Sequence, residues 1–194
     1  MAHVILGCVL SYLIGSIPFS YLIAKSVKNV DLRVVGEGNV GARNVWHVVG
    51  KKYGVLAGIL DASKGFSAYW IGFLLGLSPW WIWLCGLAAV IGHDFPVFLR
   101  GRGGKGAGTA LGFLLGMQPL IIVCLILAGG LYFLFKNFHL AIGIGMGLIP
   151  VLWKTAFRKT WIESLVVIGF LLFLGLKRIL DEPHMRRIKQ ESGW

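Results

Sequence analysis

Acidic side chains and cysteines are both scarce in this 194-residue sequence. It has 8 Asp and Glu residues against 19 Lys and Arg, and only 14% of its residues are charged. The three cysteines, Cys8, Cys85 and Cys124, lie far apart inside apolar stretches and form no C-x-x-C pair. The sequence therefore predicts neither a disulfide framework nor a metal site, and we expect the cysteines to be small core residues.

Hydrophobic residues make up 57% of the chain, which is too many for a soluble domain of this length. The sequence predicts an all-α membrane protein in which residues 1–194 form one integral-membrane domain. We expect a single bundle of about seven transmembrane helices of ~20 residues or fewer, with glycine-rich cytoplasmic loops. The predicted spans cover residues 4–24, 53–77, a third ending at 99, 107–117, a fifth ending at 135, 140–153 and 161–176, followed by a charged tail over 177–194. The short fourth and sixth spans favour a water-filled recess in which polar backbone is tolerated.

Basic residues lie mostly on one side of the predicted bundle. Only Lys154, Arg158 and Lys159 fall in a loop on the opposite side, and Lys64 falls within a span. Because cytoplasmic loops carry the excess of Lys and Arg, we predict that the charged side is cytoplasmic and that the N-terminus is outside. Topology then accounts for the formal net charge of +11, and we expect no nucleic-acid binding.

The segment from Arg100 to Thr109 is the most informative stretch of the chain. It combines glycines with three cations between two apolar runs. Glycines leave backbone N–H groups open to a ligand, and a helix that starts near Lys105 would turn its positive end toward the loop. We predict that Lys105 and the amides of residues 103–106 hold a phosphate at the membrane surface. The alternative is a solvated basic turn that only fixes topology, but topology does not require the glycines.

A second glycine-rich loop covers residues 36–41 and reads G-x-G-x-x-G. As a dinucleotide-binding fingerprint this match is weak, because the flanking sequence offers no strand–helix–strand unit. We predict instead another anion-binding loop before a short helix over residues 44–49. Asn39, Arg43 and Asn44, with the amides of residues 38–41, are expected to contact the anion.

Polar residues also occur inside the predicted spans. Asp61 and Lys64 are three residues apart and so share a helix face, and charges inside a span mark a functional site by default. The alternative is a mutual ion pair, with Lys64 reaching toward the interface. Ser16 and Ser20 of the first span are expected to share one face and to pack against a neighbouring helix. His93, near the end of the third span, is placed close to the loop over residues 100–109.

Four motifs, in order along nearly the whole chain, resemble the bacterial PlsY-type acyl-phosphate:glycerol-3-phosphate acyltransferases. They are GSIPFSYLIAK over residues 15–25, GEGNVGARN over residues 36–44, Asp61 with Lys64–Gly65, and Gly92–His93 through Phe95–Pro96 to Gly103–Gly104–Lys105–Gly106 and Thr109. The resemblance implies transfer of an acyl group from acyl phosphate to glycerol 3-phosphate, which gives lysophosphatidic acid. It also implies seven spans in the bacterial inner membrane, an outside N-terminus and an active site on the cytoplasmic side.

The loops and the resemblance together give a predicted site. Its catalytic residues are Lys105, His93 and Asn39. Its substrate-binding residues are Lys25, Gly36, Gly38, Gly41, Arg43, Asn44, Lys64, Gly103, Gly104, Gly106, Thr109, His139 and His184. No metal or cofactor is expected, and the predicted partners are acyl phosphate, glycerol 3-phosphate and membrane lipids. The sequence sets no oligomeric state, and a monomer is compatible with it.

Five positions depart from the motifs that this family usually has. In the second motif, Glu37 stands in place of a serine, Arg43 in place of a threonine and His47 in place of an arginine. His139 stands where the family tends to have a serine, and His184 aligns loosely with an asparagine of the tail. These changes leave open an altered acceptor or a low-activity, lipid-binding paralogue. An acidic Glu37 beside a phosphate is repulsive unless it is paired, and Arg43 is the candidate partner.

The H-x-x-x-x-D dyad of other glycerolipid acyltransferases is absent from the chain, and no nucleophile–base pair stands out. We therefore predict direct attack of the glycerol 3-phosphate hydroxyl on the acyl-phosphate carbonyl, without an acyl-enzyme. The protein would contribute positioning and charge neutralisation, with His93 donating a hydrogen bond or assisting proton removal. A small phosphate or anion carrier is the alternative. Against it, the chain has no internal repeat and no matched pair of broken helices.

Overall fold

The computed structural model describes residues 1–156, 158 and 160–193, without the side chains of residues 125, 138, 139, 141, 142 and 146. The regular elements of these residues are all helical, which confirms the predicted all-α fold. In chain order they are α1 (Ala2–Ser16), α2 (Phe19–Lys28), α3 (Ala42–Val48), α4 (Lys51–Leu74), α5 (Pro79–Asp94), the short 3₁₀ turn η1 (Val97–Leu99), α6 (Ala107–Met117), the 3₁₀ turn η2 (Pro119–Ile121), α7 (Ile122–Phe135), α8 (Phe138–Thr155) and α9 (Trp161–Glu191).

The chain forms two compact units. One comprises residues 1–117 and 177–194, and the other comprises residues 118–176. The second unit contains α7 and α8, which pack on each other, and the first half of α9. Asn137 caps α8, because its side-chain oxygen accepts a hydrogen bond from the N–H of Leu140 at 3.0 Å. A single domain over residues 1–194 stays a prediction.

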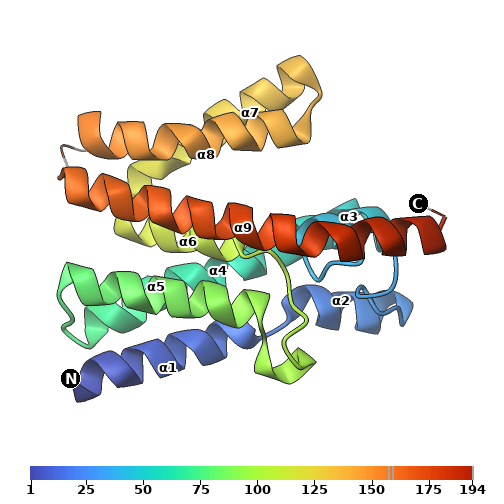
Figure 1. The fold of residues 1–194 in the computed structure, drawn as a ribbon, viewed down its shortest axis with the longest axis horizontal. Helices are drawn as coiled ribbons and strands as arrows, with labels where there is room; N and C mark the ends of the chain where they lie inside the picture. The colour runs from blue at the N-terminus through green and yellow to red at the C-terminus, as the bar shows by residue number, and fades with distance from the viewer. Residues whose placement is uncertain (157, 159, 194) are drawn as a thin grey trace. The chain divides into compact units, whose positions relative to one another are not determined.

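Small residues let the helices of the first unit approach closely. In Figure 1, α1 runs beside α5, and a Cβ atom on Gly15 would overlap the backbone of Ala89 there. In the same way α4 packs on α6, where a Cβ atom on Gly65 would overlap the carbonyl of Thr109. Close contact through small residues is typical of helices that pack within a membrane.

The lengths and surfaces of the helices fit a bilayer. Among the described residues, two stretches, Ala2–Lys28 and Pro79–Leu99, are long and apolar enough to cross a membrane. Large apolar side chains stay exposed, such as Leu74 at 77% and Phe133 at 72%. With 11 residues, α6 is ~16 Å long, about half of the ~30 Å hydrocarbon core. It is short, as predicted for the fourth span.

Two predicted spans are broken in the structure. The first span splits at Ile17–Pro18 into α1 and α2, because proline has no N–H to donate and biases the preceding residue toward extended backbone. Ser16 and Ser20 therefore lie on different helices, and the prediction of a shared face is wrong. The third span stops as an α-helix at Asp94, one residue before Phe95–Pro96.

The charged tail also differs from its prediction. We expected the last span to end near residue 176 and the tail to be only partly helical. Instead α9 runs without interruption from Trp161 to Glu191, through Pro183. Ion pairs between side chains four residues apart stabilise its last turns, at Lys177–Asp181, Arg186–Glu182 and Arg187–Glu191.

Candidate active site

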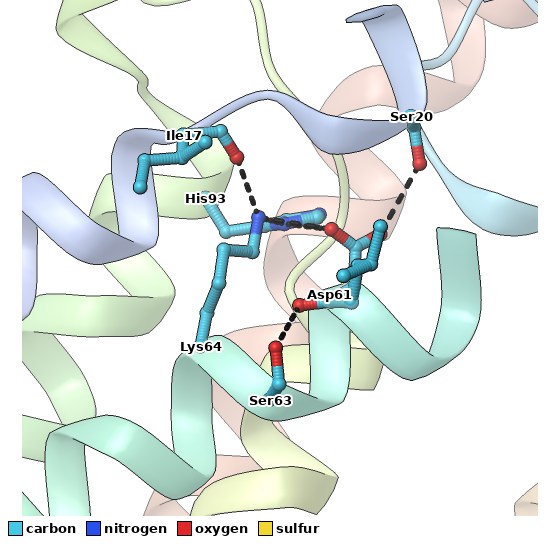
Figure 2. Close-up of polar contacts among 7 residues, drawn as sticks. Ile17, Ser20, Asp61, Ser63, Lys64 and His93 are labelled. Carbon is cyan, nitrogen blue, oxygen red and sulfur yellow. Dashed lines mark hydrogen bonds and ion pairs between the residues drawn. The ribbon is translucent and has the colours of Figure 1, made fainter. Parts of the chain in front are cut away.

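A buried lysine lies at the centre of the polar contacts in the first unit. The side chain of Lys64, on α4, is only 2% exposed. It donates to the carbonyl of Ile17 at 3.0 Å and contacts Asp61 Oδ1 and His93 Nδ1, each at 2.9 Å (Figure 2). The contacts with Ile17 and His93 are hydrogen bonds, and the contact with Asp61 Oδ1 is an ion pair. Lys64 is therefore held by three groups of the protein.

The substrate-binding role predicted for Lys64 stays a prediction. Its ammonium group is held in the interior by Asp61, His93 and Ile17 and does not extend toward the interface. The ion pair with Asp61 that we considered as the alternative is present. The lysine ties the break between α1 and α2 to α4 and α5.

The sequence did not predict that the carbonyl of Ile17 accepts a hydrogen bond from Lys64. Pro18 ends α1, so the carbonyl of Ile17 is freed from the helix ladder and turns to Lys64. Ser20, at the start of α2, donates to Asp61 Oδ2 at 3.2 Å and satisfies the other carboxylate oxygen (Figure 2). A proline inside an otherwise apolar span was the available signal for this free carbonyl.

His93 has its hydrogen on the ring nitrogen that faces the glycine loop. A lysine ammonium group can only donate, so Nδ1 accepts and, in the neutral ring, Nε2 carries the proton. A Cβ atom built on Gly104 would overlap Nε2, which shows that this nitrogen lies against the loop. Of the two roles predicted for His93, this geometry favours donation of a hydrogen bond.

The loop over residues 100–106 folds back onto the end of α5. The N–H of Gly103 donates to the carbonyl of Asp94 at 3.2 Å, and the N–H of Gly104 donates to the carbonyl of His93 at 3.0 Å. Two of the amides that we predicted for a phosphate are therefore used by the protein. The glycines are needed for close approach, since a Cβ atom on Gly103 would overlap the His93 carbonyl. Gly106, at φ +67°, ends the loop before α6 begins at Ala107.

Lys105 is the cation of this loop that we predict to contact a phosphate. Its side chain is half-buried, and no carboxylate of the described residues lies within ion-pairing distance of its ammonium group. Burial lowers the pKa of Lys105 from its ordinary value, and the charge of Glu37 opposes this change. The start of α6 follows two residues later, so a helix N-terminus adds positive potential next to the lysine.

Asn44 holds the other glycine loop together from inside. Its fully buried amide donates to the carbonyls of Leu32, Val35 and Asn39 at 2.9–3.1 Å, and its oxygen accepts from the N–H of Glu37 at 2.9 Å. The amide of Asn44 is thus engaged by backbone groups of residues 32–39, and its contact with an anion stays a prediction. Asn44 stabilises the backbone conformation of the loop.

Each glycine of this loop is needed for a different structural reason. Gly36 and Gly38 adopt φ +60° and +62°, a conformation that disfavours side chains. The N–H of Gly38 donates to Val35 at 3.0 Å, so it too is unavailable to a ligand. A Cβ atom on Gly41 would approach the side-chain nitrogen of Asn39 to 2.9 Å. Asn39 itself is only 8% exposed.

The two glycine loops meet. A Cβ atom built on Gly104 would lie 2.8 Å from the carbonyl oxygen of Val40, so the loops touch at these residues. One small pocket has walls from both loops, from the break in the first span and from the Lys64 network. Its lining includes residues 15–20, Val40, Asp61, Lys64, His93, Pro96 and Gly103. The sequence prediction that both loops serve one site is consistent with this geometry.

Other predicted site residues lie elsewhere or are not described. Thr109 is fully buried in α6 where α4 packs on it, and its substrate-binding role stays a prediction. Lys25, in the last turn of α2, and His184, on α9, are exposed, and no described contact joins them to the pocket. The prediction for the His139 side chain falls outside the described residues. The predicted pairing of Glu37 with Arg43 is confirmed, at 3.2 Å.

Gly104→Ala should disturb this site without unfolding the protein. The new methyl group would displace the His93 ring or the loop, and displacement of a positioned group by about 1 Å can cost about 100-fold in rate. We expect a loss of that order in any activity of the pocket, measured in detergent with the thermal unfolding midpoint as a check. Gly129→Ala, where a Cβ atom meets nothing within 4 Å, is the matched control. Equal activity in the two variants would contradict this assignment.

Comparison with known families now adds to the geometry. A family model described as glycerol-3-phosphate acyltransferase matches residues 5–189. The chain belongs to this family. The resemblance noted in the sequence is therefore confirmed over almost the entire chain.

Curated members of the glycerol-3-phosphate acyltransferase family are similar to the chain over most of its length. A Dehalococcoides mccartyi glycerol-3-phosphate acyltransferase is 40% identical over 61% of this chain and 65% of its own length. The Aquifex aeolicus protein is 46% identical over 67% and 68%, and the Wolbachia pipientis protein is 35% identical over 86% of both chains. The aligned stretch thus spans just under two thirds of the Dehalococcoides protein.

Two solved structures share the fold of this family member. The crystal structure of PlsY, an integral membrane glycerol 3-phosphate acyltransferase, in its glycerol 3-phosphate form has a TM-score of 0.80 and 33% identity, covering 97% of this chain and 93% of that chain. Its lysophosphatidic acid form has a TM-score of 0.77 and 30% identity with the same coverage. The chain therefore has the fold of an integral membrane protein, as its composition predicts.

Proposed function

We propose that this protein is a membrane glycerol-3-phosphate acyltransferase that uses acyl phosphate as donor and yields lysophosphatidic acid. The observation that supports it best is the meeting of two glycine loops, one with Lys105 and one with Arg43, beside the buried His93. The related PlsY structures hold glycerol 3-phosphate and lysophosphatidic acid on the same fold. A basic loop at the edge of an apolar bundle suits a substrate that has both a phosphate group and an apolar chain.

In this proposal the hydroxyl oxygen of glycerol 3-phosphate attacks the acyl carbonyl directly. The new ester bond forms as the bond to phosphate breaks, and the hydroxyl proton leaves with the phosphate. Lys105 neutralises charge on the phosphate, and the Nε2–H of His93 donates to a substrate oxygen. Asn39 is the residue proposed to contact glycerol 3-phosphate, and the acyl chain would lie between helices in the bilayer. No covalent acyl-enzyme is required, because phosphate is already a good leaving group.

We also propose that the protein is a single multi-pass domain of the bacterial inner membrane, with its N-terminus outside and its active site on the cytoplasmic side. The support is the bias of Lys and Arg toward one set of loops. A membrane-impermeant label on a cysteine introduced at position 102, in the exposed part of the glycine loop, should react only in inverted vesicles. Labelling in intact cells would contradict this orientation.

The decisive experiment supplies the purified protein with labelled glycerol 3-phosphate and one donor at a time: acyl phosphate, acyl-CoA or acyl carrier protein. We expect lysophosphatidic acid from acyl phosphate only, with one inorganic phosphate released per product. Product from the other donors alone would overturn the donor assignment. Uptake of labelled phosphate into vesicles without acylated product would favour the carrier, and binding of glycerol 3-phosphate without turnover would favour the low-activity paralogue.

A further inference from the structure

A carboxylate lies inside the loop that should hold an anion. Glu37 stands between Gly36 and Gly38, and the residue is 3% exposed. Its Oε1 forms an ion pair with Arg43 Nε at 3.2 Å. Glu37 and Arg43 are also two of the positions at which the sequence departs from the motif that it resembles.

The backbone holds Glu37 in place. Its N–H donates to the buried Asn44 oxygen at 2.9 Å, and the glycines on both sides have the positive φ angles given above. Next to it, Gly38 lies against Ile188, which a Cβ atom would approach to 2.9 Å. The backbone at Glu37 is thus fixed, which holds its carboxylate beside Arg43. A buried charge is costly without a partner, so the pair has to be considered as one unit.

The pair acts together with Lys105. The loops touch at Val40 and Gly104, and the charge of Glu37 raises the pKa of Lys105 against the larger effect of burial. The charges of Arg178 and Asp181 on α9 act on this pKa in opposite directions, and the charge of Arg43 lowers it. Two cations and one anion leave this group with one net positive charge. A phosphate dianion near the group therefore meets attraction from Lys105 and Arg43 and repulsion from Glu37.

We propose that Glu37, balanced by Arg43, weakens the hold of this site on phosphate, so that free phosphate binds poorly and the phosphate released from the donor departs readily. The carboxylate then works as a specificity-determining group against inorganic phosphate. That phosphate is a product of the reaction rests on the proposed function. The charge argument stands on the ion pair and the meeting of the loops alone.

The test is a binding cycle with inorganic phosphate as the probe, read by titration calorimetry on the full protein in detergent. Glu37→Gln keeps the shape of the side chain and removes its charge, so we expect the Kd for phosphate to fall about tenfold. Arg43→Gln should raise it about tenfold, and the double variant should lie within about threefold of the parent protein. Asp31→Asn, which removes a carboxylate that is paired with Arg33 in the same polar segment, should leave the Kd unchanged.

A Kd that stays constant or rises in Glu37→Gln overturns the proposal, and so does a similar fall in Asp31→Asn. Absence of phosphate binding in both the parent protein and Glu37→Gln also overturns it. If Arg43→Gln does not fold, Glu37→Gln alone decides. Binding needs no turnover, so a failure of acyl transfer in the donor assay would refute the proposed function without affecting this result. In an active preparation, product inhibition by phosphate should become about tenfold stronger in Glu37→Gln.

Discussion

Lys105→Ala is expected to lower turnover by about 10²–10³-fold while the protein still inserts and folds. The lysine lies in a loop, half-buried, and no carboxylate of the described residues lies within ion-pairing distance of it, so its removal breaks no ion pair of the resting protein. What is lost is the positive charge beside the phosphate when charge develops on it. The measurement is kcat and KM for glycerol 3-phosphate and acyl phosphate, together with the thermal unfolding midpoint in detergent.

Two further variants make the result on Lys105 specific. Lys105→Arg keeps the charge in a wider group and should recover part of the lost rate. Lys52→Met removes an exposed lysine of the first turn of α4 and should change the rate little, since it lies outside the loops. A Lys105→Ala protein with a rate close to the parent value would remove this residue from the mechanism.

Lys64→Met is expected to destabilise the protein strongly, far more than the loss of an exposed lysine would. It would leave the carboxylate of Asp61 buried without its cation, and the carbonyl of Ile17 with only the N–H of Phe19 as donor. Removal of one partner of a buried ion pair costs about 3–5 kcal/mol, a large part of the about 5–15 kcal/mol that stabilises a typical protein. Unfolding midpoints in detergent, and the yield of folded protein from membranes, measure the effect.

The double variant Asp61→Asn, Lys64→Met separates charge from packing. It removes the uncompensated carboxylate, so it should be more stable than Lys64→Met alone. Arg33→Gln, which breaks the more exposed Arg33–Asp31 pair, should cost far less, because such pairs contribute only about 0–1 kcal/mol. Equal midpoints for Lys64→Met and the parent protein would show that the buried network is not a stabilising element.

Much of the fold followed from the sequence because it depends on local pattern. The span over residues 107–117 coincides with α6, and Asp61 and Lys64 share a helix face as predicted, where they form the ion pair that was considered as the alternative. The break at Pro18 was missed because the apolar run continues through it, and proline is tolerated in membrane helices. The continuous α9 was missed because a charged segment outside the apolar run has no fixed end in its pattern.

The roles of individual site residues were harder to predict, because they depend on distant neighbours. Asn44 has the residue type of an anion ligand, but in the structure its amide group forms hydrogen bonds with four backbone groups of residues 32–39. Gly104 looks like a donor of a free N–H, yet its N–H binds the His93 carbonyl, and its lack of a side chain makes room for the imidazole. Residue type was sufficient to find the loops, but only the tertiary contacts separate the residues that frame them from those that face a ligand.

The main-chain oxygen of Ile17 has a consequence for how variation in this protein should be interpreted. Because the atom that Lys64 needs belongs to the peptide unit, any residue at position 17 supplies it equally well, and a scan that swaps side chains will score that position as tolerant. The side chain that matters is that of the next residue, Pro18, because its ring ends α1 and leaves the oxygen of Ile17 available to Lys64. A position can thus be indispensable to the polar centre and still be nearly silent in both mutagenesis and sequence comparison.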